Sequence, residues 1–186
     1  MIGRLSLAAL LLGCSKSSPA PTETAPVAKV TAVALARTGV CVDAPDGTAV
    51  KVARDEPGNV DVILGQLPRD ACLAGIEVYV AGSAESVKSL AELRTMIEHD
   101  HESDYALMKG PSDVMRDGRA MVTATFENHK NHLAQRQSGF MFGGHGVVIT
   151  VYGEQLQSCE ALESKLLATI RECAPAAGDR RNELVE

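Results

Sequence analysis

Aromatic residues are scarce in this chain of 186 residues, which has no tryptophan and only three phenylalanines and three tyrosines. Surfaces that hold sugars or stack nucleic-acid bases depend on several aromatic side chains, so neither kind of surface is easy to build here. Cationic residues are in deficit as well, with 18 Lys and Arg against 24 Asp and Glu, a net charge of −6. This balance disfavours nucleic acid and anionic lipid headgroups as the main partner.

Motifs for catalysis are also missing. The chain has no G-x-S-x-G elbow and no S-x-x-K motif for a nucleophilic serine. It has no G-x-x-x-x-G-K-[ST] loop for nucleotide phosphates. Carboxylates are plentiful, but no pattern singles out a pair for glycoside hydrolysis. We therefore predict that the protein is not an enzyme and needs no cofactor.

The N-terminal apolar run is too short to cross a membrane. It covers residues 5–12, whereas a transmembrane helix needs about 20 apolar residues. Arg4 precedes the run, and the small residue Gly13 follows it directly before Cys14. A positive charge, a short apolar stretch and a small residue are typical of a secretion signal that is later removed. We therefore predict that residues 1–13 are a signal peptide.

The sequence Leu11-Leu12-Gly13-Cys14 resembles the lipobox of bacterial lipoproteins. The resemblance implies that Cys14 becomes the lipidated first residue of the mature protein and anchors it to a membrane. Ser15, rather than an aspartate, follows the cysteine. In that family this implies the outer membrane of a Gram-negative cell, on either its periplasmic or its surface face.

The chain is predicted to hold one folded domain behind a tether. Residues 14–37 contain the lipidated cysteine and a proline-containing stretch without periodicity, which predicts a flexible linker spanning roughly 25 Å. Residues 27–35 could instead form an added edge strand. Residues 38–173 make up the predicted domain, and the small and charged residues 174–186 a disordered tail.

Four cysteines remain after Cys14, an even number that is typical of disulfides in an oxidising compartment. They are Cys41, Cys72, Cys159 and Cys173. The spacing of apolar residues predicts a helix over 158–173, which places Cys159 and Cys173 roughly 21 Å apart, too far for a disulfide. Two pairings stay open, Cys41 with Cys173 and Cys72 with Cys159, or the reverse. The lack of a C-x-x-C pair argues against zinc.

Turn signals divide the rest of the domain into short elements. Strands are predicted at residues 40–43, 49–53, 60–64, 76–80, 104–109, 119–126, 133–142 and 146–152, with 147–152 as a central strand covered on both faces. A helix is predicted to open at Gly82-Ser83, with Ser83 as its N-cap. Its apolar stripe consists of Val87, Leu90, Leu93 and Ile97.

This order of elements predicts an α+β fold, an antiparallel sheet sandwich with a middle helix and a C-terminal helix packed on it. It resembles the Mog1/PsbP/DcrB-like group at Asp43-Ala44-Pro45, at Gly118-Arg119 and at Gln135-Arg136-Gln137. The resemblance implies a non-enzymatic binding or assembly module. Together with the lipobox, it predicts a membrane-anchored envelope lipoprotein with a protein partner in the envelope.

The alternative is a protein that binds a metal or another small ligand. Residues 98–102 read Glu-His-Asp-His-Glu, and Asp104 follows. In a strand His99 and His101 point to the same side, as a divalent metal requires, whereas in a helix they diverge by about 200°. His99, His101 and Asp104 are the predicted ligands. The plainer interpretation of this stretch is a solvated acidic end of a helix.

The remaining histidines offer weaker candidates. His129 and His132 lie in a polar segment that is predicted to be a loop between two strands. His145 lies among three glycines, where a loop can expose backbone N–H groups to an anion. A tight hairpin turn is the simpler interpretation there.

Overall fold

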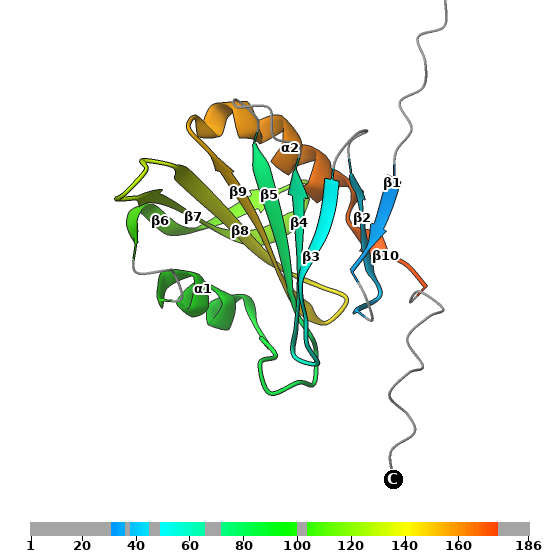
Figure 1. Ribbon diagram of the computed structural model, residues 1–186. Coiled ribbons are helices and arrows are strands. Elements are labelled where there is room, and N and C mark those ends of the chain that lie inside the picture. The colour runs from blue at the N-terminus through cyan, green and yellow to red at the C-terminus, as the bar shows by residue number, and fades with distance from the viewer. Residues whose placement is uncertain (1–30, 36–37, 45–48, 66–71, 100–103, 175–186) are drawn as a thin grey trace, which may run out of the picture.

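The computed structural model describes residues 31–35, 38–44, 49–65, 72–99 and 104–174. Figure 1 shows two helices and two antiparallel sheets. The strands are β1 (Thr31–Ala34), β2 (Val40–Ala44), β3 (Ala49–Asp55), β4 (Asn59–Gly65), β5 (Leu73–Tyr79), β6 (Tyr105–Arg116), β7 (Arg119–Asn128), β8 (Ala134–Phe142), β9 (His145–Gly153) and β10 (Arg171–Glu172). The helices are α1 (Leu90–His99) and α2 (Leu156–Thr169). The predicted α+β sandwich with a middle and a C-terminal helix is confirmed. The predicted signal peptide and Cys14 lie outside the described residues.

The larger sheet has seven strands in the order β3-β4-β5-β9-β8-β7-β6, and the smaller has three in the order β1-β2-β10. Strand β9 lies between β5 and β8. Its residues Gly146 to Val151 are all buried, which confirms the predicted central strand. A strand that is covered on both faces needs apolar residues at successive positions, and the run from Val147 supplies them.

Two tight hairpins confirm the predicted turns. Asp117 and Gly118 have φ angles of 52° and 75°, and Gly143 and Gly144 have φ angles of 55° and 83°. Two-residue turns with positive φ at both positions match the right-handed twist of the paired strands. Glycine and aspartate tolerate this conformation better than most residues, so these sequences specify where the strands reverse.

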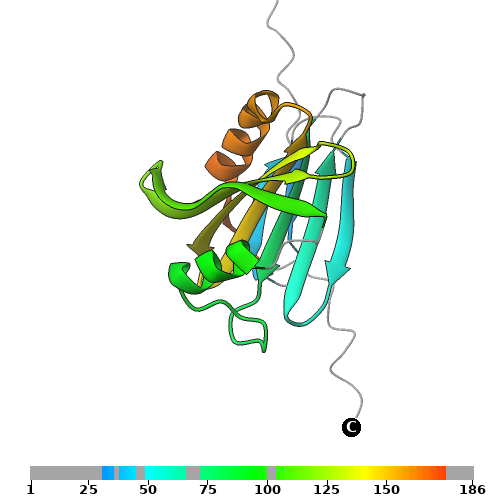
Figure 2. The ribbon, with the colours of Figure 1, turned by 90° about the vertical axis from the view of Figure 1, so that its left-hand side faces the viewer.

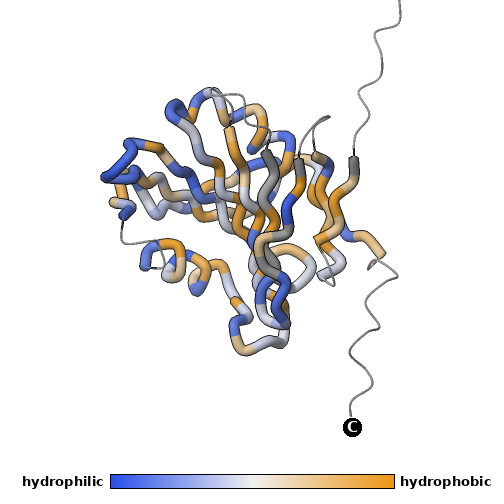
Figure 3. Tube along the Cα trace, in the orientation of Figure 1, coloured by the Kyte–Doolittle hydropathy of each residue, from blue (hydrophilic) through white to orange (hydrophobic). Residues whose placement is uncertain are grey.

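A separate hydrophobic core lies against each face of the large sheet. On one face, α2 and the small sheet enclose a cluster that includes Val42, Ile76, Phe140, Ile149 and Leu166. On the other face, α1 packs over a second cluster. Figure 2 looks onto that face, with α1 in front of the sheet and β3, β4 and β5 beside it without a helix in front of them. In Figure 3 both helices mix hydrophobic and hydrophilic residues, as expected for helices with one buried face.

The first helix begins later than predicted. Residues 81–85 form a turn, residues 86–89 are not helical, and α1 starts at Leu90. The Ser89 hydroxyl accepts a hydrogen bond from the N–H of Glu92 at 3.2 Å, and the Glu92 carboxylate accepts one from the N–H of Lys88 at 2.8 Å. Ser89 therefore caps the helix in place of Ser83. The Ser83 hydroxyl donates to the carbonyl of Val80 at 2.7 Å and stabilises the preceding turn.

The C-terminal helix ends earlier than predicted. It stops at Thr169, Ile170 is extended, and Arg171 and Glu172 pair with β2 as β10. The N–H of Cys173 donates to the carbonyl of Gly39 at 2.9 Å. Helical periodicity continues through this segment in the sequence, but pairing with β2 replaces the helical hydrogen bonds. Strand β1 also corrects the prediction, because it lies inside the range assigned to the linker and matches the alternative of an added edge strand.

Helix α1 approaches the sheet closely because Gly139 has no side chain. A Cβ built at Gly139 would lie 2.7 Å from Cδ1 of Ile97 and 2.8 Å from Cδ2 of Leu93. We expect Gly139→Ala to lower the free energy of unfolding by about 1 to 3 kcal/mol, because the helix must shift in a packed core. Chemical denaturation monitored by circular dichroism measures this change.

Gly75 provides the matched control, because it is also a strand glycine on the α1 face. A Cβ there would meet only Cε2 of Tyr152, at 3.9 Å, an ordinary contact. Gly75→Ala should therefore change stability by less than about 0.5 kcal/mol. Equal losses in the two variants would contradict the close approach of α1 at Gly139.

Candidate functional site

The four cysteines of the domain form two disulfides. Cys41 bonds to Cys173 with a Cα–Cα distance of 5.8 Å, and Cys72 bonds to Cys159 with a distance of 5.3 Å. The sequence left two pairings open, and the structure contains the pairing of Cys41 with Cys173 and Cys72 with Cys159. Cys159 and Cys173 are not paired with each other, as predicted. The two bonds join opposite ends of the α2 segment to the N-terminal half of the domain.

The predicted metal ligands are only partly within the described residues. His99 is the last residue of α1 and is exposed. Asp104 forms an ion pair with Lys130, with 2.7 Å between Nζ and Oδ2. His101 lies outside the described residues, and among those described no group of three or more metal-binding side chains is present. A metal site at His99, His101 and Asp104 stays a prediction.

The other histidines have roles within the fold. His132 has a φ angle of 57° in the turn after β7, and its Nδ1 lies 3.1 Å from Oε1 of Glu127. The N–H of His129 donates to the carbonyl of Asp104 at 2.8 Å. Nδ1 of His145 accepts a hydrogen bond from the N–H of Ala81 at 3.0 Å. That bond joins the turn between β8 and β9 to the loop between β5 and α1.

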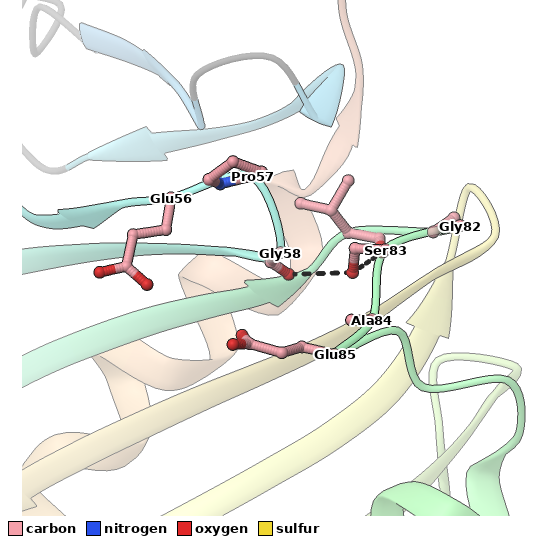
Figure 4. Close-up of a pocket in the computed structure, with 9 residues that line it drawn as sticks. Glu56, Pro57, Gly58, Gly82, Ser83, Ala84 and Glu85 are labelled. Atoms are coloured by element: carbon pink, nitrogen blue, oxygen red, sulfur yellow. Dashed lines mark hydrogen bonds between the residues drawn. The ribbon is translucent and has the colours of Figure 1, made fainter.

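A cavity of about 520 Å³ lies at this end of the large sheet. The turn between β3 and β4 and the loop after β5 line it, and Figure 4 shows the two segments facing each other. The lining residues are Glu56, Pro57, Gly58, Val80, Ala81, Gly82, Ser83, Ala84 and Glu85. The N–H of Val80 donates to the carbonyl of Gly58 at 2.9 Å, and the Ser83 hydroxyl lies 3.5 Å from the same oxygen. These bonds hold the two segments together.

The cavity carries two carboxylates and no cationic side chain in its described lining. Glu56 and Glu85 are both exposed, and their carboxyl groups point to the same side in Figure 4. The side chain of Glu85 passes close to Gly58, where an added Cβ would lie 3.1 Å from its Oε2. Such a cavity suits a positively charged or hydrogen-donating group. Water also solvates exposed carboxylates well, so the cavity by itself assigns no ligand.

Sequence reasoning did not find this cavity. The sequence predicted a turn between the strands at 49–53 and 60–64 and, separately, the start of a helix at Gly82-Ser83. They come together because β4 and β5 pair with Asn59 opposite Tyr79, which brings the residues just before β4 next to those just after β5. Pairing of neighbouring strands was predicted, but its register was not.

Comparison with known proteins identifies the fold of this chain. No protein-family model matches the sequence, and no curated protein has a significantly similar sequence. The structure, in contrast, is similar to that of the cyanobacterial PsbP protein, CyanoP, from Synechocystis. The TM-score is 0.52 at 15% sequence identity, and the match covers 84% of this chain and 98% of CyanoP. The chain has a PsbP-like fold.

The matches to other PsbP-like and Mog1-like structures are weaker. The Ran-binding protein Mog1p from Saccharomyces cerevisiae matches with a TM-score of 0.48 and 7% identity, over 78% of this chain and 96% of Mog1p. LpqN from Mycobacterium tuberculosis, described as involved in cell envelope biogenesis, matches with a TM-score of 0.38 and 11% identity, over 78% of this chain and 91% of LpqN. The match to CyanoP by itself confirms the predicted PsbP-like fold.

Proposed function

We propose that this chain is an envelope lipoprotein, anchored to the outer membrane through Cys14, whose PsbP-like domain is a non-enzymatic binding or assembly module. The domain is held close to the membrane by the segment that precedes β1. Neither helix in the described part of the chain is long and apolar enough to span a membrane. On this proposal the lipid, and not a protein segment, supplies the attachment.

The two disulfides are the observation that carries the proposal. Each one joins residues far apart in sequence, with separations of 132 and 87 residues. Stable disulfides of this kind occur mainly in proteins outside the reducing cytosol. A secretion signal with a lipobox directs a chain to an oxidising compartment. The disulfides and the N-terminal signal are therefore two independent features that support the same location.

The anchor has a direct test. In cells of its source, or in a Gram-negative host, the mature protein should begin at Cys14 with acyl chains attached, and mass spectrometry of the N-terminal peptide should detect them. Cys14→Ser should move the protein from the membrane fraction to the soluble periplasmic fraction, because one polar substitution removes every acyl chain. An unmodified N-terminus that begins at Met1 would overturn the anchor.

The binding role needs a separate test. Chemical cross-linking in intact cells, followed by purification of the full chain from membranes, should yield a defined protein partner. The Cys14→Ser variant serves as the control, because it retains the domain but loses its position at the membrane. Recovery of the wild-type chain as a monomer without any cross-linked protein would contradict an assembly role.

A further inference from the structure

Two carboxylates without a partner lie in the cavity between the β3–β4 turn and the loop after β5. Glu56 and Glu85 line this cavity, and both side chains are exposed. Within the described part of the chain, neither carboxylate forms a hydrogen bond or an ion pair. Their carboxyl groups point to the same side in Figure 4, so a single cationic group can approach both of them.

A buried amide oxygen beside this cavity also lacks a partner. Asn59 follows the lining residue Gly58 and lies opposite Glu56 in the hairpin, where Glu56 and Asn59 exchange two backbone hydrogen bonds of 3.0 and 3.2 Å. Asn59 is only 2% exposed, and its Oδ1 accepts no hydrogen bond. Buried polar atoms are normally paired with protein, ordered water or a ligand. This oxygen therefore calls for a donor that the described residues do not supply.

Glu77 sets the orientation of this amide. Nδ2 of Asn59 donates to Oε1 of Glu77, and the reversed amide would place two acceptors against each other. Glu77 lies opposite Asp61, farther into the sheet, so the bond turns Oδ1 the other way, toward the turn that lines the cavity. Glu56 is the directly opposed residue at that turn, and directly opposed side chains of an antiparallel pair share a face.

The charge around the Asn59 amide is negative. Glu56 and Glu77 flank it, and Glu85 reaches the same turn, since its Oε2 lies 3.1 Å from the point where a Cβ of Gly58 would be. No cationic side chain belongs to the described lining of the cavity. Carboxylates and an amide oxygen are all acceptors, and the potential of several carboxylates attracts a cation. The group that this site lacks is therefore a positively charged donor.

An ammonium group matches these acceptors better than a metal ion does. A lysine side chain ends in three N–H donors and no acceptor, one donor for each of the Glu56 carboxylate, the Glu85 carboxylate and Oδ1 of Asn59. Calcium takes about six to eight oxygen ligands, and the described residues contain no group of three or more metal-binding side chains. The cavity volume of about 520 Å³ also leaves room for the alkyl chain behind the ammonium.

We propose that this cavity binds the side-chain ammonium of a lysine on a partner protein, through the carboxylates of Glu56 and Glu85 and through Oδ1 of Asn59. The two glutamates make the first contact, because Oδ1 is sealed from solvent in the free protein and becomes accessible as the exposed side chains shift toward the ligand. This inference rests on the proposed role as a binding module and names the chemistry that the module recognises.

Selection from a library of random peptides displayed on phage tests the proposal, with the purified, oxidised full chain as bait. We expect the selected peptides to share a lysine at one fixed position. Norleucine at that position keeps the alkyl chain and removes the ammonium, and it should weaken binding at least about tenfold, the loss expected when hydrogen bonds to a charged group are removed. Binding should also weaken as the salt concentration rises.

Glu85→Gln and Glu56→Gln remove the two charges one at a time and should each weaken binding at least about tenfold. Glu154→Gln is the matched control. It makes the same chemical change at an exposed position that follows the far end of β9, whereas His145 at the near end contacts the cavity loop. Glu154→Gln should leave binding within about twofold.

Circular dichroism and the melting temperature establish that each variant is folded, and Glu56→Gln provides the same test if Glu85→Gln is not. A consensus without lysine, equal binding of the norleucine peptide, unchanged binding to both glutamine variants, or no selected peptide would each overturn the proposal. Calcium chloride that raises the melting temperature of wild type but not of Glu85→Gln, and that displaces the peptide, would identify a metal site instead and overturn the lysine. Failure here, while Cys14 is acylated and a cross-linked partner is still recovered, would reject this cavity and leave the module function standing.

Discussion

Replacing both Cys72 and Cys159 by alanine is expected to lower the free energy of unfolding by about 2 to 5 kcal/mol. The bond connects residues separated by 87 positions, so its loss greatly increases the conformational freedom of the unfolded chain. The chain-entropy model gives about 4 to 5 kcal/mol for a loop of this length. Because small domains are stable by only about 5 to 15 kcal/mol, a loss of this size brings the domain close to unfolding. Urea denaturation under non-reducing conditions measures the effect.

The wild-type protein under reducing conditions provides the control for this experiment. Reduction should lower its stability at least to that of the Cys72→Ala/Cys159→Ala variant, because it removes both bonds. The Cys41→Ala/Cys173→Ala variant reports separately on the bond that holds β10 and β2 together. A double-alanine variant as stable as the oxidised wild type would contradict the conclusion that the disulfides restrain this fold, and would weaken the argument for an oxidising compartment.

Replacing Arg136 by alanine is expected to lower the free energy of unfolding by about 3 kcal/mol. Glu163 on α2 is 1% exposed, and its carboxylate accepts hydrogen bonds from Nη2 of Arg136 and from the hydroxyl of Ser138, both on β8. Without Arg136 a buried carboxylate loses its main counter-charge. The cost lies at the lower end of the range for breaking a buried ion pair, because Nη1 of Arg116 remains 3.6 Å from Oε2.

Glu160 supplies the matched control for Arg136→Ala. It lies 3.6 Å from Nη1 of Arg136 but is 59% exposed, and exposed pairs contribute at most about 1 kcal/mol. Glu160→Gln should therefore change stability little. The Arg136→Met/Glu163→Met variant removes both charges together and should be more stable than Arg136→Ala, because no buried charge is left unpaired. Equal losses for Arg136→Ala and Glu160→Gln would contradict a buried ion pair that holds α2 on the sheet.

Much of the fold could be predicted because local chemistry specifies it. Asp117-Gly118 and Gly143-Gly144 set the hairpins through their positive φ angles, and the apolar run of β9 set the centre of the sheet. The ends of both helices were predicted less well. Ser83 and Ser89 are equally good N-cap residues in isolation, and only the hydrogen bonds of Ser83 with the turn after β5 decide between them. Helical periodicity likewise continued past Thr169, where pairing with β2 ended the helix.

The candidate surfaces were harder to predict than the elements. The cavity beside Glu56 and Glu85 combines two turns separated by more than twenty positions, and the α1 face of the large sheet combines residues of β8 and β9. Each depends on strand register, because a shift of one residue moves every side chain to the opposite face. The Gln135-Arg136-Gln137 sequence was noted as a pattern, yet only the register shows that its glutamines share the α1 face while Arg136 reaches Glu163 on the other.

The sequence by itself determined the α+β class, the reversals of the chain, the apolar central strand and the exclusion of one cysteine pairing, since each follows from residues close together along the chain. The tertiary structure alone decided which disulfide pairing is formed, where both helices end, and which polar side chains meet on each face of the sheet. The reason is physical. Turn and helix preferences act over a few residues, whereas register and packing depend on contacts between residues that are distant in sequence and become neighbours only when the whole sheet has formed.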